Sequence, residues 1–236
     1  MADKPSPWNG WRLTGLISTG LILMALVIAL LAPTPVEGAR LVIRTSARTS
    51  LLLFTAAFTA SALARLAPSK PTRWLLANRR YLGVSFAVSH FVHAAAVIAL
   101  LRLDRPLFLE LTNTATYVGG GLVYVFIILM TATSFDGAAA WIGRRTWRWL
   151  HSVGAWYIWL IFAVSFGMRA PVNAMYYSAV AVVFLAPAVR ITALLRRRAR
   201  PGVEIGGLAL SSATIAQSTA SRSLSAPRGQ ASVGSL

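Results

Sequence analysis

Residues 79–101 read RRYLGVSFAVSHFVHAAAVIALL, and this stretch decides the fold class. From Tyr81 to Leu101 it contains no Asp, Glu, Lys or Arg, and its length matches the roughly 20 residues that a helix needs to cross a bilayer. Arg79 and Arg80 stand at its start, where long cationic side chains can reach the polar headgroups. We therefore predict a transmembrane helix here.

Five further stretches of the 236-residue chain resemble this one in length and hydrophobicity. With 56% hydrophobic and 12% charged residues, the chain is too apolar for a soluble domain, in which about a quarter of the residues are charged. We predict an all-α membrane protein, a bundle of six transmembrane helices. The expected spans are residues 13–33, 49–64, 81–101, 111–134, 149–168 and 172–189, and Pro187 is expected to kink the last one.

Composition divides the chain into three parts. Residues 1–10 form a short N-terminal segment, and residues 11–200 form the transmembrane domain. Beyond Arg200, Ser, Ala, Gly and Thr dominate and aromatic residues are few, so residues 201–236 are expected to be a disordered tail. The first span has a longer apolar core than the roughly 7–15 residues of a signal peptide, and we expect it to be retained as a helix.

The formal net charge of +17 comes from 23 Lys and Arg residues against six acidic ones. The basic residues stand at the borders of the apolar stretches and not along one folded face, so we predict contact with membrane lipids and no nucleic-acid partner. An even number of spans places both termini on one side. Fifteen Lys and Arg residues fall on that side and six on the other, which predicts that both termini are cytoplasmic.

All three histidines lie in apolar stretches, where an imidazole is costly unless it is paired, coordinated or facing a polar cavity. His90 and His93 follow Arg79 by eleven and fourteen residues, and His151 follows Arg144 by seven. On the helix rise, these histidines lie about 16, 21 and 10 Å from their arginines. Two helices that each supply one neutral imidazole can hold a b-type haem. We therefore predict these three residues as candidate metal ligands.

The sequence RRYLG at residues 79–83, followed by His93, and the sequence RRTWRWLH ending at His151 resemble the ferric reductase-like transmembrane domain family. This family includes the haem-binding membrane subunit of the bacterial methionine sulfoxide reductase system and, more distantly, NADPH oxidases and iron reductases. The resemblance covers about residues 11–195. It implies that His93 and His151 bind haem and that the protein passes electrons across the bacterial inner membrane. The family usually has a second histidine about thirteen residues after the first on the fifth helix, where this chain has Val164.

Because Val164 cannot bind iron, we expect one haem b. Its axial ligands would be His151 and either His90 or His93, since the nominal heights of His90 and His151 differ by only about 6 Å. Arginines at the cytoplasmic ends of the helices can meet haem propionates through charge-assisted hydrogen bonds, although each also serves as a marker of topology. The expected propionate partners are Arg79, Arg80, Arg145 and Arg148.

The sequence contains no glycine-rich dinucleotide fingerprint, no phosphate-binding loop and no cysteine. We therefore expect an oxidoreductase component without a flavin or nicotinamide site of its own. Its electrons would come from a quinone or from a separate flavin reductase docked on the basic face, and they would reach a periplasmic redox partner. Two other classes stay open. One is a haem-free bundle of the same fold with a structural or partner-anchoring role, and the other is a small transporter that uses the histidines as a proton relay.

Overall fold

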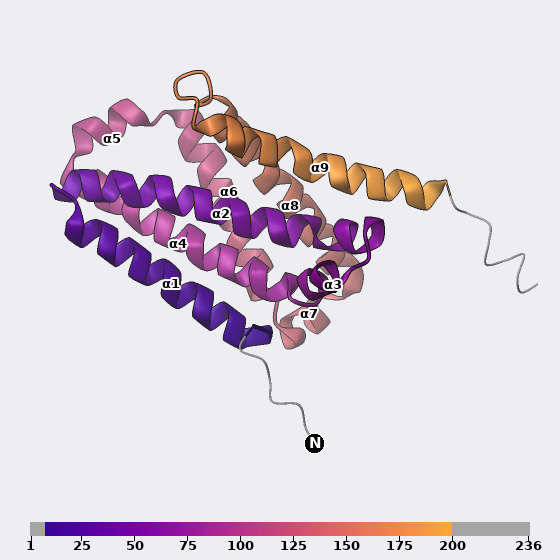
Figure 1. Cartoon of the computed structure of the whole chain (residues 1–236). Coiled ribbons are helices and arrows are strands. Elements are labelled where there is room, and N and C mark those ends of the chain that lie inside the picture. The colour runs from indigo at the N-terminus through magenta and orange to yellow at the C-terminus, as the bar shows by residue number, and fades with distance from the viewer. Residues whose placement is uncertain (1–7, 200–236) are drawn as a thin grey trace, which may run out of the picture. The chain divides into compact units, whose positions relative to one another are not determined.

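The computed structural model describes residues 8–199, and within these residues the chain forms nine α-helices and no strand. Six of the helices are long and apolar enough to cross a membrane, which confirms the predicted all-α six-helix bundle. The predictions for residues 1–7 and for the tail at 201–236 lie outside the described residues. The long helices are α1 (Gly10–Leu31), α2 (Pro35–Leu66), α4 (Arg79–Leu103), α6 (Thr114–Ala132), α8 (Arg144–Gly167) and α9 (Tyr176–Arg198), and the short ones are α3 (Lys70–Ala77), α5 (Arg105–Leu111) and α7 (Asp136–Ile142) (Figure 1).

The chain divides into two compact units, and the first extends to Ala193. Within this unit α1, α2 and α4 pack side by side, and α6 packs along α8 (Figure 1). The short helices α3 and α7 follow α2 and α6, respectively, and both lie at the end of the unit where α4 and α8 begin. This end is called the basic end below.

Helix α2 is 32 residues long, whereas the sequence predicted a span of 49–64. Its N-terminus is capped by Thr34, whose side chain accepts a hydrogen bond from the backbone N–H of Glu37, and Pro35 occupies the first turn. Glu37 then pairs with Arg40 at 3.2 Å and with Arg44 at 3.9 Å. The basic residues that the hydropathy pattern assigned to a loop are therefore helical, because a local carboxylate balances them.

Helix α9 also exceeds its predicted end at residue 189. It continues through Pro187 and includes Arg190. The guanidinium of Arg190 donates a hydrogen bond to the carbonyl oxygen of Phe58 at 2.9 Å and lies 4.1 Å from the centre of that ring. These contacts let a cation lie within the helix, which the hydropathy pattern did not anticipate. A kink at Pro187 stays a prediction.

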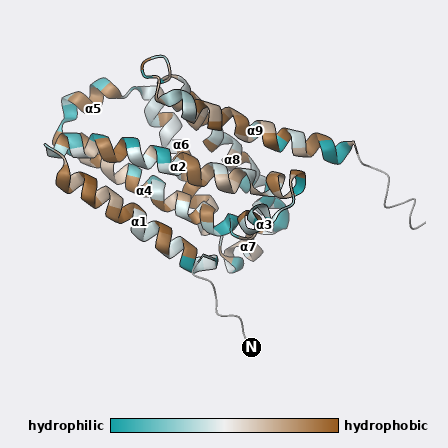
Figure 2. Cartoon of the chain, viewed as in Figure 1, coloured by the Kyte–Doolittle hydropathy of each residue, from teal (hydrophilic) through white to brown (hydrophobic). Residues whose placement is uncertain are grey.

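The helices carry apolar side chains on both their inner and outer faces. Inside, an aromatic cluster joins α2, α4 and α8 through Phe54, Phe58, Phe86 and Phe162. Outside, large apolar residues are exposed along the spans, and hydrophilic residues gather around α3 and α7 (Figure 2). Such outer faces are those of a multi-pass membrane protein in contact with lipid.

Candidate functional site: a cavity at His151

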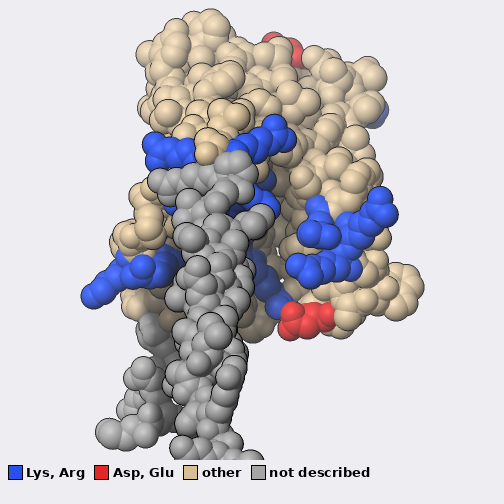
Figure 3. All heavy atoms as spheres, turned by 90° about the vertical axis from the view of Figure 1, so that its right-hand side faces the viewer, with Lys and Arg blue, Asp and Glu red and all other residues tan. Residues whose placement is uncertain are grey.

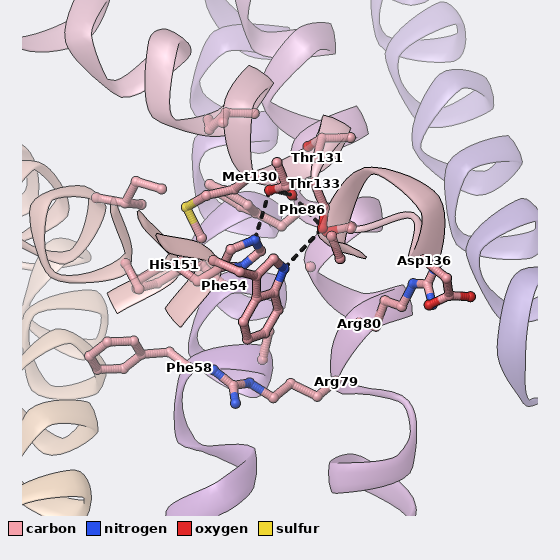
Figure 4. A pocket seen from close by; sticks show the side chains of 18 residues that line it. Phe54, Phe58, Arg79, Arg80, Phe86, Met130, Thr131, Thr133, Asp136 and His151 are labelled. Atoms are coloured by element: carbon pink, nitrogen blue, oxygen red, sulfur yellow. Dashed lines mark hydrogen bonds and ion pairs between the residues drawn. The ribbon is translucent and has the colours of Figure 1, made fainter. Parts of the chain in front are cut away.

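A cavity of about 350 Å³ lies at the basic end of the first unit, and His151 is on its wall. Residues of α2, α4, α6, α7 and α8 contribute to the wall, together with the link between α6 and α7. Figure 4 shows the side chains around it. We call this space the His151 cavity. It is lined by Phe54, Ala57, Phe58, Arg79, Arg80, Gly83, Phe86, Ile127, Met130, Thr131, Thr133, Ser134, Asp136, Ala139, Trp147, His151, Ala155 and Ile158.

The ring of His151 is held by two neighbours. Trp147, one turn earlier on α8, stacks on it with ring centres 4.2 Å apart, and Thr133 Oγ1 lies 3.0 Å from His151 Nε2. The single hydroxyl hydrogen of Thr133 has its shortest contact, 2.7 Å, with the carbonyl oxygen of Leu129. We therefore assign His151 Nε2 as the donor to Thr133. The Thr133 carbonyl oxygen accepts a second hydrogen bond from Trp147 Nε1 at 2.9 Å, so Thr133 fixes both rings (Figure 4).

Two arginines from the first turn of α4 also line the cavity. Arg79 donates a hydrogen bond to Ser61 Oγ at 3.0 Å. Arg80 pairs with Asp136 at 2.8 Å, but Asp136 is 94% exposed on its side chain, and such surface pairs are weak. The Nε atom of Arg80 is buried and has no hydrogen-bond partner among the described residues. The cavity wall therefore carries two guanidiniums and one carboxylate. On the surface at the basic end, Lys and Arg are also more prominent than Asp and Glu (Figure 3).

The remaining wall is mainly apolar. Phe54, Phe58 and Phe86 form its aromatic part, and Ala155 and Ile158 form the part on α8. Gly83 leaves the α4 side open, because a Cβ atom added there would meet no atom within 4 Å. An imidazole, two guanidiniums and an aromatic wall in one space suit a flat, anionic, largely apolar ligand.

His90 and His93 lie next to each other on α4, with ring centres 5.3 Å apart. The ring of His90 also contacts Phe86 at 5.4 Å and Phe162 at 6.1 Å. Its Nδ1 atom is buried and has no hydrogen-bond partner among the described residues. Phe86 also lines the His151 cavity, whereas His90 does not.

The ring of His93 is hydrogen-bonded to α2. Its Nδ1 atom lies 3.1 Å from the carbonyl oxygen of Ile43 and 3.1 Å from Ser46 Oγ. A carbonyl oxygen accepts only, so Nδ1 is the donor and carries the proton. The ring therefore joins two helices by a hydrogen bond.

The structure brings His90 and His93 together but does not bring His151 to either of them. Phe162, whose ring contacts His90, lies eleven residues after His151 on α8, which is about 16 Å along the helix axis. Two imidazole nitrogens on one metal ion lie about 4 Å apart, twice a metal–nitrogen bond of about 2 Å. The sequence estimate placed Arg79 and Arg144 at one depth, whereas in the structure it is His151 that shares a cavity with Arg79. The first turns of α8 thus lie beyond the start of α4.

The other predicted site residues lie away from the cavity wall. Neither Arg145 nor Arg148 lines the cavity, and both are exposed, with Arg148 Nε donating to the carbonyl oxygen of Arg144 at 3.3 Å. Val164, the position at which the resembling family has a histidine, is 49% exposed. Of the four predicted arginines, Arg79 and Arg80 are the ones at the cavity.

Sequence reasoning missed Thr133 and Trp147. Trp147 precedes His151 by four residues, and this spacing places two residues on one helix face, so the sequence held a signal for that contact. The polar run TATS at residues 131–134 follows an apolar span, but nothing in it indicates that Thr133 faces α8.

Among residues 8–199, no three His, Cys, Asp or Glu side chains gather as a metal-binding group. An iron held in a porphyrin needs fewer ligands from the protein, because the macrocycle supplies four nitrogens. Comparison with family models, curated proteins and solved structures finds no match to this chain.

Proposed function

We propose that this chain is the electron-transfer subunit of a membrane oxidoreductase and binds one haem b in the His151 cavity. The observation that carries the proposal is that one cavity gathers His151, Arg79 and Arg80 from two helices that are distant in sequence. Imidazole is a common axial ligand of haem iron, and guanidinium binds carboxylates such as propionates through charge-assisted hydrogen bonds.

The donor set fits a haem with one protein ligand. A single hydroxyl, that of Thr133, engages His151 Nε2, so exchanging this hydrogen bond for a bond to iron costs about 0.5–1.5 kcal/mol. The open α4 side at Gly83 gives a flat ring room to approach. The cavity volume of about 350 Å³ lies at the lower end of the range of about 300–1,000 Å³ found for ligand sites.

In this proposal His151 is the one axial ligand that the protein supplies to the haem iron, whereas the sequence predicted two axial histidines. The α4 residues on the cavity wall are Arg79, Arg80, Gly83 and Phe86, and none of them is a histidine. His90 and His93 are not proposed as iron ligands, and Arg145 and Arg148 are not proposed to bind the haem propionates.

The residues around the cavity have separate tasks in this proposal. Haem, when bound, would supply a one-electron carrier inside the bundle. Trp147 stacks on the His151 ring and fixes its plane, and the Thr133 carbonyl oxygen holds Trp147 Nε1 in place. Arg79 and Arg80 hold negative charge at the polar end of the cavity. The three phenylalanines exclude water, which strengthens each electrostatic contact within the site.

The proposal includes an external electron donor, either a membrane quinol or a flavin reductase, and a periplasmic redox partner. The surplus of arginine at the basic end would steer an acidic partner surface there (Figure 3). We place this end and both termini on the cytoplasmic side of a bacterial inner membrane. The chain has no cysteine, so Arg73→Cys and Glu110→Cys each create a single labelling site. An impermeant maleimide on intact cells should label residue 110 and not residue 73, and the reverse pattern would invert the topology.

The test of haem binding is an absorbance spectrum of protein purified from haem-supplied cells. We expect a Soret band that is lost in His151→Ala and kept in both His90→Ala and His93→Ala. Gly83→Leu should weaken the band by filling the cavity, and the Cβ atom that it adds would meet no atom within 4 Å. A Soret band that survives His151→Ala would refute the site.

A haem-free bundle is the second candidate function, and the hydrogen bonds of His93 to Ile43 and of His151 to Thr133 favour it. In that case the histidines join helices and the protein anchors a partner. Its signature would be a folded protein with no Soret band at any haem supply. His151→Ala would then lower the free energy of unfolding and change nothing in the visible spectrum.

A further inference from the structure

Three arginines converge on one face of the last turns of α2 without a carboxylate among them. Phe58, Ser61 and Arg65 follow one another at spacings of three and four residues, so they share a helix face. Arg190 of α9 lies on Phe58, and Arg79 of α4 donates to Ser61. Arg65 itself completes the row, which spans about 10 Å along the helix axis.

Arg190 is the most deeply placed of the three. Phe58, which it contacts, precedes the end of α2 by eight residues, or about 12 Å of helix. Its guanidinium also lies 5.6 Å from the ring of Trp156, so aromatic faces on α2 and α8 hold it in place. An arginine at such a depth usually pairs with an anion or with backbone carbonyl oxygens. The Phe58 carbonyl is the one hydrogen-bond acceptor of Arg190 among the described residues, whereas a guanidinium carries five N–H donors.

Each carboxylate among the described residues either forms an ion pair with another arginine or lies far from these three arginines. Among residues 8–199, the ion pairs join Glu37 to Arg40 and Arg44, and Asp136 to Arg80. Asp104 and Glu110 belong to α5 and its cap, at the end of α4 opposite Arg79. Arg65 lies close enough to Arg79 and Arg190 to repel both guanidiniums, and Arg79 also repels Arg190. A set of like charges at this spacing calls for a counter-anion.

We propose that Arg65, Arg79 and Arg190 bind the phosphate group of an acidic phospholipid at the edge of the bundle. The row begins near the end of a membrane span and reaches about two helix turns inward, the depth range of a headgroup and the first part of its acyl chains. Basic pockets between transmembrane helices on the cytoplasmic side recognise such headgroups. The site goes beyond the proposed haem function, although Arg79 borders both.

The test counts the lipids retained by the protein in nanodiscs of phosphatidylcholine mixed with phosphatidylglycerol, by native mass spectrometry. We expect bound phosphatidylglycerol in the parent protein and a loss of about fivefold in affinity in Arg65→Gln and again in Arg190→Gln. Arg102→Gln, which removes the same charge in the last turn of α4, is the matched control and should retain the lipid. Equal retention in all three variants would overturn the proposal. Arg65 is exposed, so its variant tests the site even where Arg190→Gln fails to fold.

Two further experiments distinguish a lipid phosphate from a free phosphate ion and from the haem propionates. In phosphatidylcholine nanodiscs, sodium phosphate should stabilise the protein no more than sodium chloride of equal ionic strength, and a specific effect of phosphate would assign the site to a free anion instead. In the His151→Ala background phosphatidylglycerol retention should persist. Its loss together with the haem would show that the three arginines serve the cofactor, and would overturn the lipid site while leaving the haem site intact.

Discussion

His93 of α4 donates its Nδ1 proton to the backbone carbonyl oxygen of Ile43 in α2, across 3.1 Å. A carbonyl oxygen has two lone pairs, so Ile43 can accept this bond in addition to the hydrogen bond within its own helix. Ser46 Oγ, at 3.1 Å from the same nitrogen, reinforces the contact. The imidazole that the sequence presents as a metal ligand therefore acts, in this structure, as a link between two spans.

We expect His93→Ala to lower the free energy of unfolding by about 0.6–2 kcal/mol, the range for interhelical hydrogen bonds in membranes. His93→Asn should recover part of this loss, because its amide nitrogen can donate from nearly the same place. Unfolding in mixed detergent micelles measures both variants. A loss of the Soret band in His93→Ala, with stability unchanged, would contradict this assignment and return His93 to the ligand set.

Thr133→Val should tighten haem binding. The hydroxyl of Thr133 competes with iron for His151 Nε2, and removing a hydrogen bond worth about 0.5–1.5 kcal/mol corresponds to a gain of about two- to tenfold in affinity. Titration of the haem-depleted protein measures it, with Thr133→Ser as the control that keeps the competing hydroxyl. If Thr133→Val instead binds haem tenfold more weakly, Thr133 orients the ligand, and Nδ1 is the ligating atom.

The number of spans could be predicted from the sequence, because apolar length is a property of each segment alone. Helix ends were less predictable. Arg40 and Arg44 lowered the hydropathy of the first half of α2, yet Glu37 balances them within the helix. Arg190 ended the predicted sixth span, yet its partner is Phe58 of a different helix.

Individual residues of the candidate site could be predicted from the sequence, but the way in which the helices bring them together could not. His151, Arg79 and Arg80 were each identified, and they do share one cavity. Their relation to His90 depended on the offset between α4 and α8, which is set by packing. The contact of Phe162 with His90 fixes that offset, and no local pattern encodes it.

Gly154→Ala should destabilise the protein and disturb the cavity. A Cβ atom there would lie 2.6 Å from Met130 Sδ and 3.0 Å from the ring of Phe126, so both side chains must move. Overpacking of this kind costs about 1–3 kcal/mol. Gly120→Ala, whose Cβ would meet nothing within 4 Å, is the matched control and should be neutral or slightly stabilising. Thermal unfolding and haem content report the two effects, since Met130 lines the His151 cavity. Equal unfolding temperatures for the two variants would be evidence against this packing.

Ser89→Ala should cost more stability than Ser85→Ala, although both serines are completely buried. Ser89 Oγ accepts a hydrogen bond from Ser50 Oγ at 2.9 Å, across the α2–α4 contact, whereas Ser85 Oγ donates to Tyr81 of its own helix. Removing Ser89 leaves a buried hydroxyl without its acceptor, at about 1–3 kcal/mol. A double-mutant cycle of Ser50→Ala with Ser89→Ala should show a coupling of about 0.6 kcal/mol. If the cycle shows no coupling free energy, and Ser85→Ala and Ser89→Ala lower the stability equally, then the hydrogen bond between Ser50 and Ser89 does not hold α2 and α4 together.

Val164→His should not add a second haem, even though the resemblance to ferric reductase-like domains implies a histidine at this position. Val164 is 49% exposed, so an imidazole there points toward the outer face of α8, while Phe162 is the α8 residue that meets His90. An imidazole that faces lipid has no partner on α4 and no cavity beside it. The ratio of haem to protein, measured by the pyridine haemochrome assay, should therefore equal that of the parent chain. A doubled ratio would mean that α8 can turn to direct residue 164 toward His93, and the helix orientation on which the single-haem proposal depends would then be wrong.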